Sequence, residues 1–300
     1  MKRRDLAALA LVLLPALAGA AAPVVYRIAP RDTDPSIKRY NEPHFVMLDP
    51  SAAASADLLV FLPGTEGRPE RVSELLKVAL TQGYRTVSLS YNNSPSVVSL
   101  CVRDPDPECS AKVRLKRSLG EDATSRIDDT RSESILSRLT MLLATLHRDH
   151  PAEGWGGYLQ ADGPRWERIA LAGHSQGAGM TAFIAQRKRV ARAILFSGPT
   201  DFYGPGSRLA PWILAGPGVT PAPAWYAAYH ARENNAKLIA LAYKSLTVPE
   251  ANVVVHTLQP AWFITSDPYH LIVPDGTVPR ASDGSPAYSG EWRFLLGHSR

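Results

Sequence analysis

A short apolar segment that ends in glycines on both sides of a serine most constrains the fold of this chain. Residues 169–180 read Ile-Ala-Leu-Ala-Gly-His-Ser-Gln-Gly-Ala-Gly-Met. Gly173 to Gly177 fits G-x-S-x-G, in which a buried strand turns sharply into a helix and leaves the serine hydroxyl exposed. Side chains two residues before and after Ser175 would collide, because the strand and helix backbones nearly touch there. The helix N-terminus would favour negative charge developing at the serine.

Apolar runs and helical spacings alternate along the rest of the chain. Asp57 to Leu62 is a nearly unbroken apolar run, typical of a strand that is buried on both faces. Strands are expected at 24–28, 45–48, 57–62, 85–91, 168–172, 192–197, 225–230 and 261–265. Helices are expected at 69–82, 133–147, 178–186 and 236–244. This order predicts an α/β fold with a mostly parallel central sheet and helices on both faces.

The length of 300 residues suits one large α/β domain, expected here to span 23–300. Residues 92–131 interrupt the alternation of strands and helices. They hold both cysteines, few large apolar residues and a dense mixture of charges. We expect this insertion to run over the edge of the sheet.

The first 22 residues have the layout of a secretory signal peptide. Three basic residues follow Met1, an apolar run extends from Leu6 to Leu17, and small residues then offer cleavage after Ala20 or Ala22. The apolar run is short for a membrane span and Pro15 interrupts it, so no stable membrane anchor is expected. The sequence therefore predicts a secreted or periplasmic protein. Adjacent arginines leave both the general and the twin-arginine export routes open, and an uncleaved anchor is the alternative.

Charge and cysteine content exclude several classes of function. Loss of residues 1–20 would lower the formal charge from +5 to +3, and the remaining basic residues are scattered, so no nucleic-acid partner is expected. Cys101 and Cys109 enclose a short segment that contains two prolines. Export to an oxidising compartment makes a local disulfide the expected pairing. A metal site needs more ligands than this segment offers, and the sequence shows no zinc-finger, P-loop or G-x-G-x-x-G motif, so neither a metal nor a cofactor is expected.

Candidate chemical groups follow four separate predicted strands, and ligands collect at the carboxyl ends of strands in such sheets. These groups are Gly64-Thr65, Ser175, Asp201 or Glu233, and His270. With these residues, the chain resembles the α/β-hydrolase family, which includes many lipases, esterases and cutinases. The resemblance covers most of the mature chain as strand order, while Gly-His-Ser-Gln-Gly is the only specific motif. The family's chain order of nucleophile, acid and histidine is met here.

The resemblance implies that Ser175 is a nucleophile, which needs a base because a serine hydroxyl is barely ionised at neutral pH. His270 is the expected base, because the loop after the final predicted strand can place an imidazole over the serine. His230 also lies near a strand end and is its competitor. A base at His230 would, however, precede the last strand.

The acid that orients the imidazole is expected to be Glu233 or Asp201. Glu233 follows the strand where the family usually places this residue, although aspartate is commoner there. Asp201 follows the preceding strand, an arrangement that some lipases resemble. We slightly favour Glu233, and the carboxylate that is not used would be structural.

The resemblance also implies an oxyanion hole, in which two backbone N–H groups stabilise the charge of the transition state. One donor would be Gln176, next to the nucleophile, and the second would come from the loop after residues 57–62, with Thr65 as the expected residue. An ordinary tight turn is the alternative for Pro63-Gly64-Thr65.

These features predict a secreted serine hydrolase that cleaves carboxylic esters through an acyl-enzyme. Because the insertion is charged rather than apolar, small-molecule or polymeric esters are expected as substrates rather than oil surfaces. The alternative is a non-catalytic protein that uses the same fold for binding, since a fold does not fix a function.

Overall fold

The structure of the chain is a computed structural model that describes residues 22–297 except 54–55, 205–207 and 262–264. The predicted signal peptide, apart from Ala22, therefore lies outside the described residues. So do three residues of the strand predicted at 261–265.

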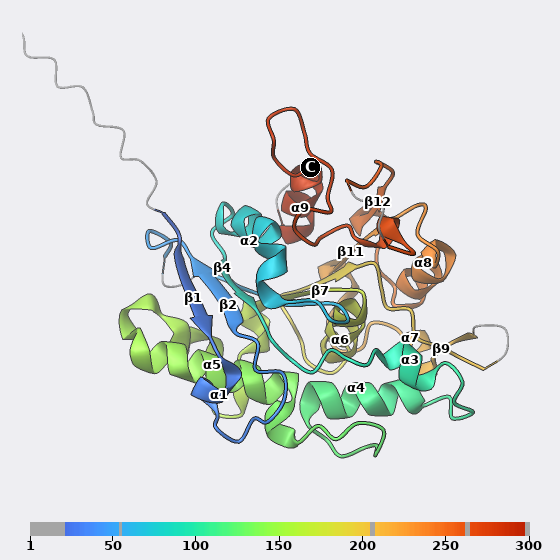
Figure 1. Cartoon of the computed structure of the whole chain (residues 1–300), viewed down its shortest axis with the longest axis horizontal. Helices are drawn as coiled ribbons and strands as arrows, with labels where there is room; N and C mark the ends of the chain where they lie inside the picture. Colours follow the sequence, from blue (N-terminus) through green and yellow to red (C-terminus); the bar gives the residue numbers. More distant parts are fainter. Residues whose placement is uncertain (1–21, 54–55, 205–207, 262–264, 298–300) are drawn as a thin grey trace, which may run out of the picture.

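An eight-stranded sheet forms the centre of the molecule (Figure 1). Its spatial order is β1-β2-β4-β3-β7-β8-β11-β12. The strands are β1 (Val24–Ile28), β2 (His44–Leu48), β3 (Leu58–Leu62), β4 (Arg85–Ser88), β7 (Ile169–His174), β8 (Arg192–Phe196), β11 (Trp225–His230) and β12 (Val253–His256). β2 runs antiparallel to both of its neighbours, and every pair from β4 to β12 is parallel. The prediction of a mostly parallel sheet is confirmed.

Two layers of helices cover the faces of the sheet. One face packs against α2 (Ser73–Leu80) and α9 (Ser289–Leu296), which lie together above the sheet in Figure 1. The other packs against α5 (Ile135–Asp149), α6 (Gln176–Ala185) and α8 (Ala236–Ser245). The smaller elements are α1 (Pro30–Thr33), α7 (Pro211–Leu214) and two short hairpins, β5 (Leu159–Gln160) with β6 (Gly163–Pro164) and β9 (Phe202–Tyr203) with β10 (Arg208–Leu209).

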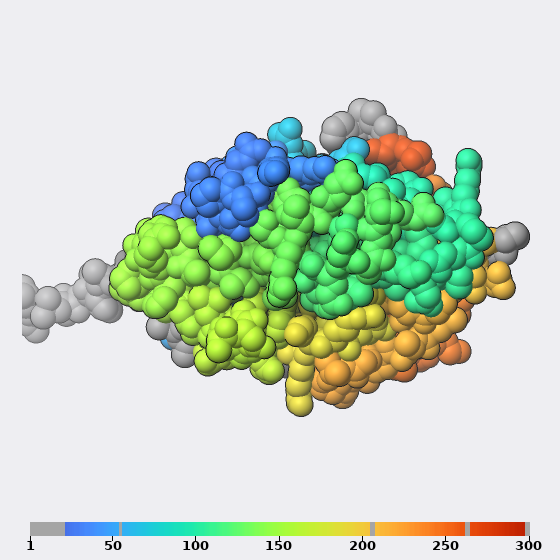
Figure 2. All heavy atoms as spheres, turned by 90° about the horizontal axis from the view of Figure 1, so that it is seen from below, coloured from blue at the N-terminus to red at the C-terminus, as the bar shows by residue number. Residues whose placement is uncertain are grey.

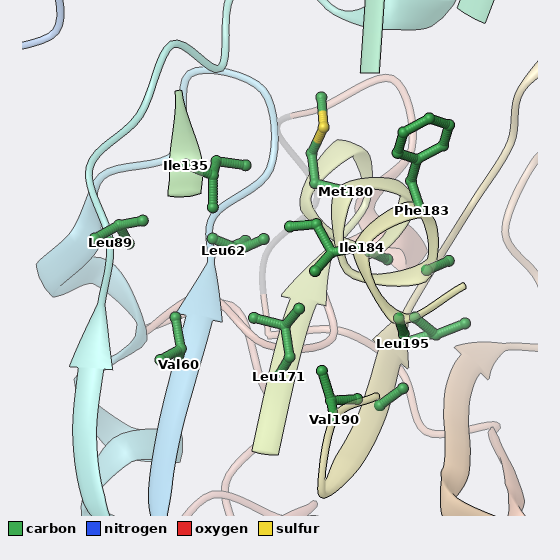
Figure 3. Close-up of a cluster of buried hydrophobic side chains, with 14 of the residues drawn as sticks. Val60, Leu62, Leu89, Ile135, Leu171, Met180, Phe183, Ile184, Val190 and Leu195 are labelled. Carbon is green, nitrogen blue, oxygen red and sulfur yellow. The ribbon is translucent and has the colours of Figure 1, made fainter. Parts of the chain in front are cut away.

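Alternation along the central strands divides their side chains between two cores. In β3, Leu58, Val60 and Leu62 face the α5–α6 layer, whereas Leu59 and Phe61 face the α2–α9 layer. All five are fully buried, as expected for a strand covered on both faces. Figure 3 shows strand side chains meeting the inner side of α6; the labelled residues there include Val60, Leu171, Leu195, Met180, Phe183 and Ile184. Full burial of each such side chain contributes roughly 1.5–3 kcal/mol, which fixes α6 on β7.

The last described strand of the sheet is β12, which the sequence did not predict. Val253, Val254 and Val255 form a β-branched run that pairs in parallel with β11. His270 therefore comes 14 residues after the end of β12, in the short 3-10 helix η8 (Pro268–His270), rather than directly after a strand.

The insertion at 92–131 does not run over the edge of the sheet. It forms α3 (Val97–Cys101) and α4 (Cys109–Leu119), and α4 packs on both α5 and α6. Figure 2 shows the green residues of this region across the middle of the molecular face, between blue N-terminal and orange C-terminal segments. Several of its charges point inward: Arg114 and Arg117 are fully buried and lie against Asp201 and Asp129. The scarcity of large apolar residues in this segment suggested that it is exposed. Buried arginine–aspartate pairs and a disulfide instead hold it against the helices.

The disulfide predicted between Cys101 and Cys109 is present, and it joins the end of α3 to the start of α4. Within the described parts of the chain, no helix is both long and apolar enough to cross a bilayer.

Candidate active site

Ser175 lies at the sharp turn between β7 and α6. Its backbone has φ 55° and ψ −118°, a region that costs a non-glycine residue about 1–3 kcal/mol. Its N–H donates to the carbonyl of Phe196 at 2.8 Å, which ties the turn to the end of β8. Sheet and helix together therefore hold the serine in a conformation that an isolated segment would not keep.

Two glycines make this turn possible. A Cβ on Gly177 would lie 1.9 Å from the carbonyl oxygen of Leu62, and a Cβ on Gly173 would lie 2.3 Å from that of Gly177. Neither distance is sterically possible for a real side chain, and the close partners are backbone atoms that cannot move aside. The expected near-contact of strand and helix backbones is confirmed.

His270 and Ser175 line the same two cavities. The side chain of His270 is 27% exposed, and its Nδ1 lies 2.8 Å from Oε2 of Glu233. With the Nδ1 proton donated to that carboxylate, Nε2 is left unprotonated and able to accept a proton. The carbonyl of His270 accepts a hydrogen bond from Nε2 of His174 at 2.8 Å.

Burial and, to a smaller extent, the nearby His270 lower the pKa of the His174 imidazole to about 3. His174 therefore stays neutral and keeps a single ring proton, and Nε2 donates that proton to the carbonyl of His270. From its position inside the turn, the side chain of His174 is expected to be directed away from Ser175. In the structure, its Nε2 holds the backbone that carries His270.

Glu233 is a fully buried carboxylate with three donors. Besides Nδ1 of His270, it accepts from Oγ of Ser197 at 2.8 Å and from the backbone N–H of His230 at 2.7 Å. Three hydrogen bonds to the ionised form offset much of the cost of burying this charge and fix its position. No sequence motif points to Ser197, which lies just past the end of β8 at φ 53°.

Asp201 lies in a different network. Its two oxygens accept from Nε and Nη2 of Arg114 at 2.6 and 2.5 Å, and Nε1 of Trp212 donates to it at 3.0 Å. Arg114 and Asp201 are both almost completely buried, so this is a bidentate ion pair inside the protein. The geometry favours Glu233 over Asp201 as the partner of the imidazole.

His230, the competing base, has both ring nitrogens engaged. Nε2 lies 2.8 Å from the carbonyl of Leu258, and Nδ1 accepts from the backbone N–H of Arg232 at 3.0 Å. Its side chain is buried. No ring nitrogen of His230 is left to receive a proton from a nucleophile.

Thr65 and Gln176 both border the serine. Gln176 is the first residue of α6, and the first four N–H groups of a helix have no acceptor within the helix. Thr65 follows β3 and, like Ser175 and His270, lines both cavities. A Cβ on the preceding Gly64 would lie 3.2 Å from Cβ of Ser175, so this loop runs against the turn.

Residues of the insertion hold the side chain of Gln176 by hydrogen bonds. Its Oε1 accepts from the backbone N–H of Val97 at 2.7 Å and from Nη1 of Arg117 at 3.1 Å, and its Nε2 donates to the carbonyl of Asn93. The carbonyl of Gln176 also accepts from Nη1 of Arg114 at 3.3 Å. The insertion at 92–131 therefore fixes the position of Gln176, the residue after Ser175.

Two cavities meet at Ser175, Thr65 and His270. The first, the apolar cavity, has a volume of about 560 Å³; Phe61, Val72, Leu271 and Pro274 line it, with exposed charged residues at 66, 68 and 71. The second, the polar cavity, has a volume of about 320 Å³; Arg114, Thr200, Asp201, Asn235 and Asp267 line it. Both volumes suit small-molecule sites.

Strand order, the strained serine and the flanking glycines together decide the fold class. The chain has the α/β-hydrolase fold. Among the described residues, no group of three histidine, cysteine or acidic side chains is arranged to hold a metal ion.

Comparisons by sequence find no matching family model and no matching curated protein. Solved structures resemble the chain at low identity. The TT1662 protein of Thermus thermophilus is 14% identical with a TM-score of 0.48, covering 93% of this chain and 100% of its own. A "Putative Dienelactone Hydrolase" from Klebsiella pneumoniae is 13% identical with a TM-score of 0.41, covering 80% and 86%. A "putative hydrolase of the alpha/beta superfamily" from Xanthomonas campestris is 15% identical with a TM-score of 0.39, covering 80% and 96%.

Proposed function

We propose that this protein is a serine hydrolase that cleaves carboxylic esters through an acyl-enzyme. The observation that carries the proposal is the 2.8 Å contact between His270 and the buried Glu233, beside a serine in a strained turn. An imidazole oriented by a carboxylate next to a nucleophile is the arrangement that activates a serine hydroxyl.

The first half of the proposed reaction forms the acyl-enzyme. Oγ of Ser175 attacks the ester carbonyl carbon while its proton passes to Nε2 of His270. Glu233 stabilises the imidazolium that results. The backbone N–H groups of Thr65 and Gln176 donate hydrogen bonds to the carbonyl oxygen and stabilise the negative charge that develops on it. When the tetrahedral intermediate collapses, the C–O bond to the alcohol breaks and His270 returns the proton to the departing oxygen.

The second half releases the acid. A water molecule takes the place of the alcohol, gives its proton to His270 and attacks the acyl carbon. Collapse of the second intermediate breaks the bond to Ser175, and the proton on His270 returns to Oγ. Asp201 takes no part in these steps, because Arg114 and Trp212 occupy its oxygens.

A fluorophosphonate probe tests the proposal, because it labels only an activated serine. We expect the wild-type protein to be labelled and to hydrolyse short chromogenic esters, and Ser175→Ala to lose both properties. Ser266→Ala is the matched control, since Ser266 also lines the polar cavity. An unlabelled, well-folded wild-type protein would instead point to a non-catalytic binding protein.

We further propose that the protein acts outside the cytoplasm, as the sequence of residues 1–22 suggests. The disulfide between Cys101 and Cys109 supports this, because such bonds persist in oxidising compartments. N-terminal sequencing of the protein recovered from the periplasm or medium tests the proposal; a mature chain that still begins at Met1 would contradict cleavage.

A further inference from the structure

Asn93, the second residue of the insertion, binds the loop that carries Thr65. Its Nδ2 donates to the carbonyl of Gly64 at 2.9 Å and to the carbonyl of Gly67 at 2.8 Å. A side-chain oxygen in that place would face two carbonyl oxygens, so these contacts identify the atom as the nitrogen. The N–H of Gly67 also donates to the carbonyl of Gly64, at 3.0 Å. Asn93 therefore bridges the two ends of the turn at 64–67.

The contact with Gly64 also sets the direction of the N–H of Thr65. The carbonyl and this N–H belong to one planar peptide unit, in which the two groups point in opposite directions. Because glycine puts few limits on the rotation of its peptide, a hydrogen bond from outside the loop is what restrains this unit. Oη of Tyr91 holds the preceding peptide by donating to the carbonyl of Pro63 at 2.7 Å. The second proposed oxyanion donor is thus oriented by side chains that follow β4.

The backbone of Asn93 holds the other proposed donor. Its carbonyl accepts from Nε2 of Gln176, the residue whose backbone N–H lies next to the nucleophile. Asn93 is buried, and the described residues that line the two cavities at Ser175 do not include it. It lines a third cavity of about 170 Å³, which shares residues 66–68 with the apolar cavity. Asn93 therefore acts on a bound ester only through Thr65 and Gln176.

One buried residue thus connects both N–H groups of the proposed oxyanion hole. Building on the proposed function, we propose that Asn93 is a positioning residue that sets the direction of the Thr65 N–H and its spacing from the N–H of Gln176. These N–H groups contribute most when charge develops on the ester oxygen, and less when the ester first binds. Loss of their alignment therefore lowers kcat far more than it changes KM.

Asn93→Asp tests the inference, because it keeps the shape of the side chain and replaces the NH₂ group by an oxygen. A carboxylate oxygen then faces the carbonyls of Gly64 and Gly67 and repels both. We expect kcat for a short chromogenic ester to fall by about 10²- to 10³-fold, with KM within about threefold. Asn93→Ala removes the donor without adding repulsion, so its kcat should fall by only about tenfold. This second variant carries the test if Asn93→Asp folds poorly.

A trifluoromethyl ketone with the acyl chain of the ester gives a second measurement. Oγ of Ser175 adds to its carbonyl carbon and passes its proton to His270, which leaves an oxyanion at the position that the two N–H groups face. Its inhibition constant should rise in each Asn93 variant by the factor by which kcat falls, which a change in folded fraction alone would not produce.

Asn252→Asp is the matched control. Nδ2 of Asn252 also donates to two backbone carbonyls, those of Trp225 at 3.0 Å and Pro223 at 3.4 Å. This contact lies at the start of β11, whereas Ser175 follows the end of β7. The control should leave kcat and the inhibition constant within about twofold, because it disturbs a similar contact away from the reacting atoms.

Three results would overturn the inference. They are an unchanged kcat in both Asn93 variants, a loss that lies in KM rather than kcat, and a lower kcat without a matching rise in the inhibition constant. Each would leave the proposed function in place if cleavage by the wild-type protein depends on Ser175. Cleavage that persists in Ser175→Ala, or none by the wild-type protein, would refute the proposed function and this inference with it.

Discussion

Nδ1 of His270 lies 2.8 Å from Oε2 of Glu233, although 37 residues separate them in the chain. Glu233 follows β11, while His270 lies in η8, beyond β12. His174 holds the backbone of His270 from one side, and Ser197 and His230 hold the carboxylate from the other. The imidazole is thus fixed at its ring and at its own carbonyl.

The two candidate acids should respond differently to loss of charge. In Glu233→Gln the amide oxygen still accepts from Ser197 and His230, but an NH₂ group then faces Nδ1 of His270. The imidazole must adopt the tautomer with Nε2 protonated, so we expect kcat to fall by about 10²- to 10⁴-fold with little change in stability. Ester turnover and urea unfolding measure the two effects.

Asp201→Asn should show the reverse pattern. It leaves the buried Arg114 without its counter-ion, so we expect a loss of about 3–5 kcal/mol in the free energy of unfolding. Turnover per folded molecule should fall far less than in Glu233→Gln. A larger loss of turnover in Asp201→Asn would transfer the orienting role to Asp201.

The glycines of the serine turn should not tolerate a methyl group. Gly177→Ala places Cβ 1.9 Å from the carbonyl oxygen of Leu62, so we expect at least several kcal/mol of destabilisation and no soluble active protein. Gly290→Ala is the matched control, because nothing lies within 4 Å of its Cβ and it occupies α9. It should stabilise the protein by up to about 1 kcal/mol. A well-folded, active Gly177→Ala protein would refute the close packing of strand and helix.

The disulfide should affect catalysis as well as stability. It joins α3, which holds Gln176 through Val97, to α4, which holds Gln176 through Arg117. Replacing both cysteines by serine should cost about 2.5 kcal/mol of stability from chain entropy. It should also lower kcat about 10- to 100-fold, because the N–H beside Ser175 is less well fixed. Reduction of the wild-type protein should reproduce the loss, and a change in KM alone would contradict this explanation.

Acid should unfold the protein in part through its buried histidines. Burial lowers the pKa of His44, His174 and His256 to about 3 in each case, with nearby Arg138, His270 and His230 adding to the respective shifts. The unfolded chain binds protons near pH 6.5 and the native chain does not, so stability is full above about pH 6.5 and falls as the pH drops toward 3. Each histidine contributes a slope of about 1.4 kcal/mol per pH unit in that window.

Unfolding experiments between pH 4 and 7 measure this slope. His44→Gln should flatten it, because glutamine can still accept from the N–H of Ser90 but does not titrate. The exposed His147→Gln should leave it unchanged. Equal slopes in the wild-type and His44→Gln proteins would mean that His44 is not held neutral by the fold.

The apolar patterns of the chain predicted most of the sheet but not its last strand. A run of consecutive apolar residues such as 57–62 would expose apolar side chains on one face unless both faces of the strand were covered. These runs do form buried strands. The last strand is expected at 261–265, of which 262–264 lie outside the described part of the chain, whereas the Val-Val-Val run of β12 forms the last described strand. The insertion differs from its expected place at the sheet edge because its arginines pair with Asp201 and Asp129 inside the protein. A charge pattern alone does not reveal a partner that is distant in sequence.

The sequence by itself determined the serine turn, because Gly173 and Gly177 are demanded by the backbone contacts of that turn and are visible in five consecutive residues. It also determined the cysteine pair, which is separated by only eight positions. Only the tertiary structure decided which carboxylate contacts the imidazole of His270 and that His174 bonds to the backbone of His270. It also decided that the insertion binds the side chain of Gln176. Those contacts join segments that are dozens of residues apart, and their geometry depends on how sheet and helices pack, which local sequence patterns do not encode.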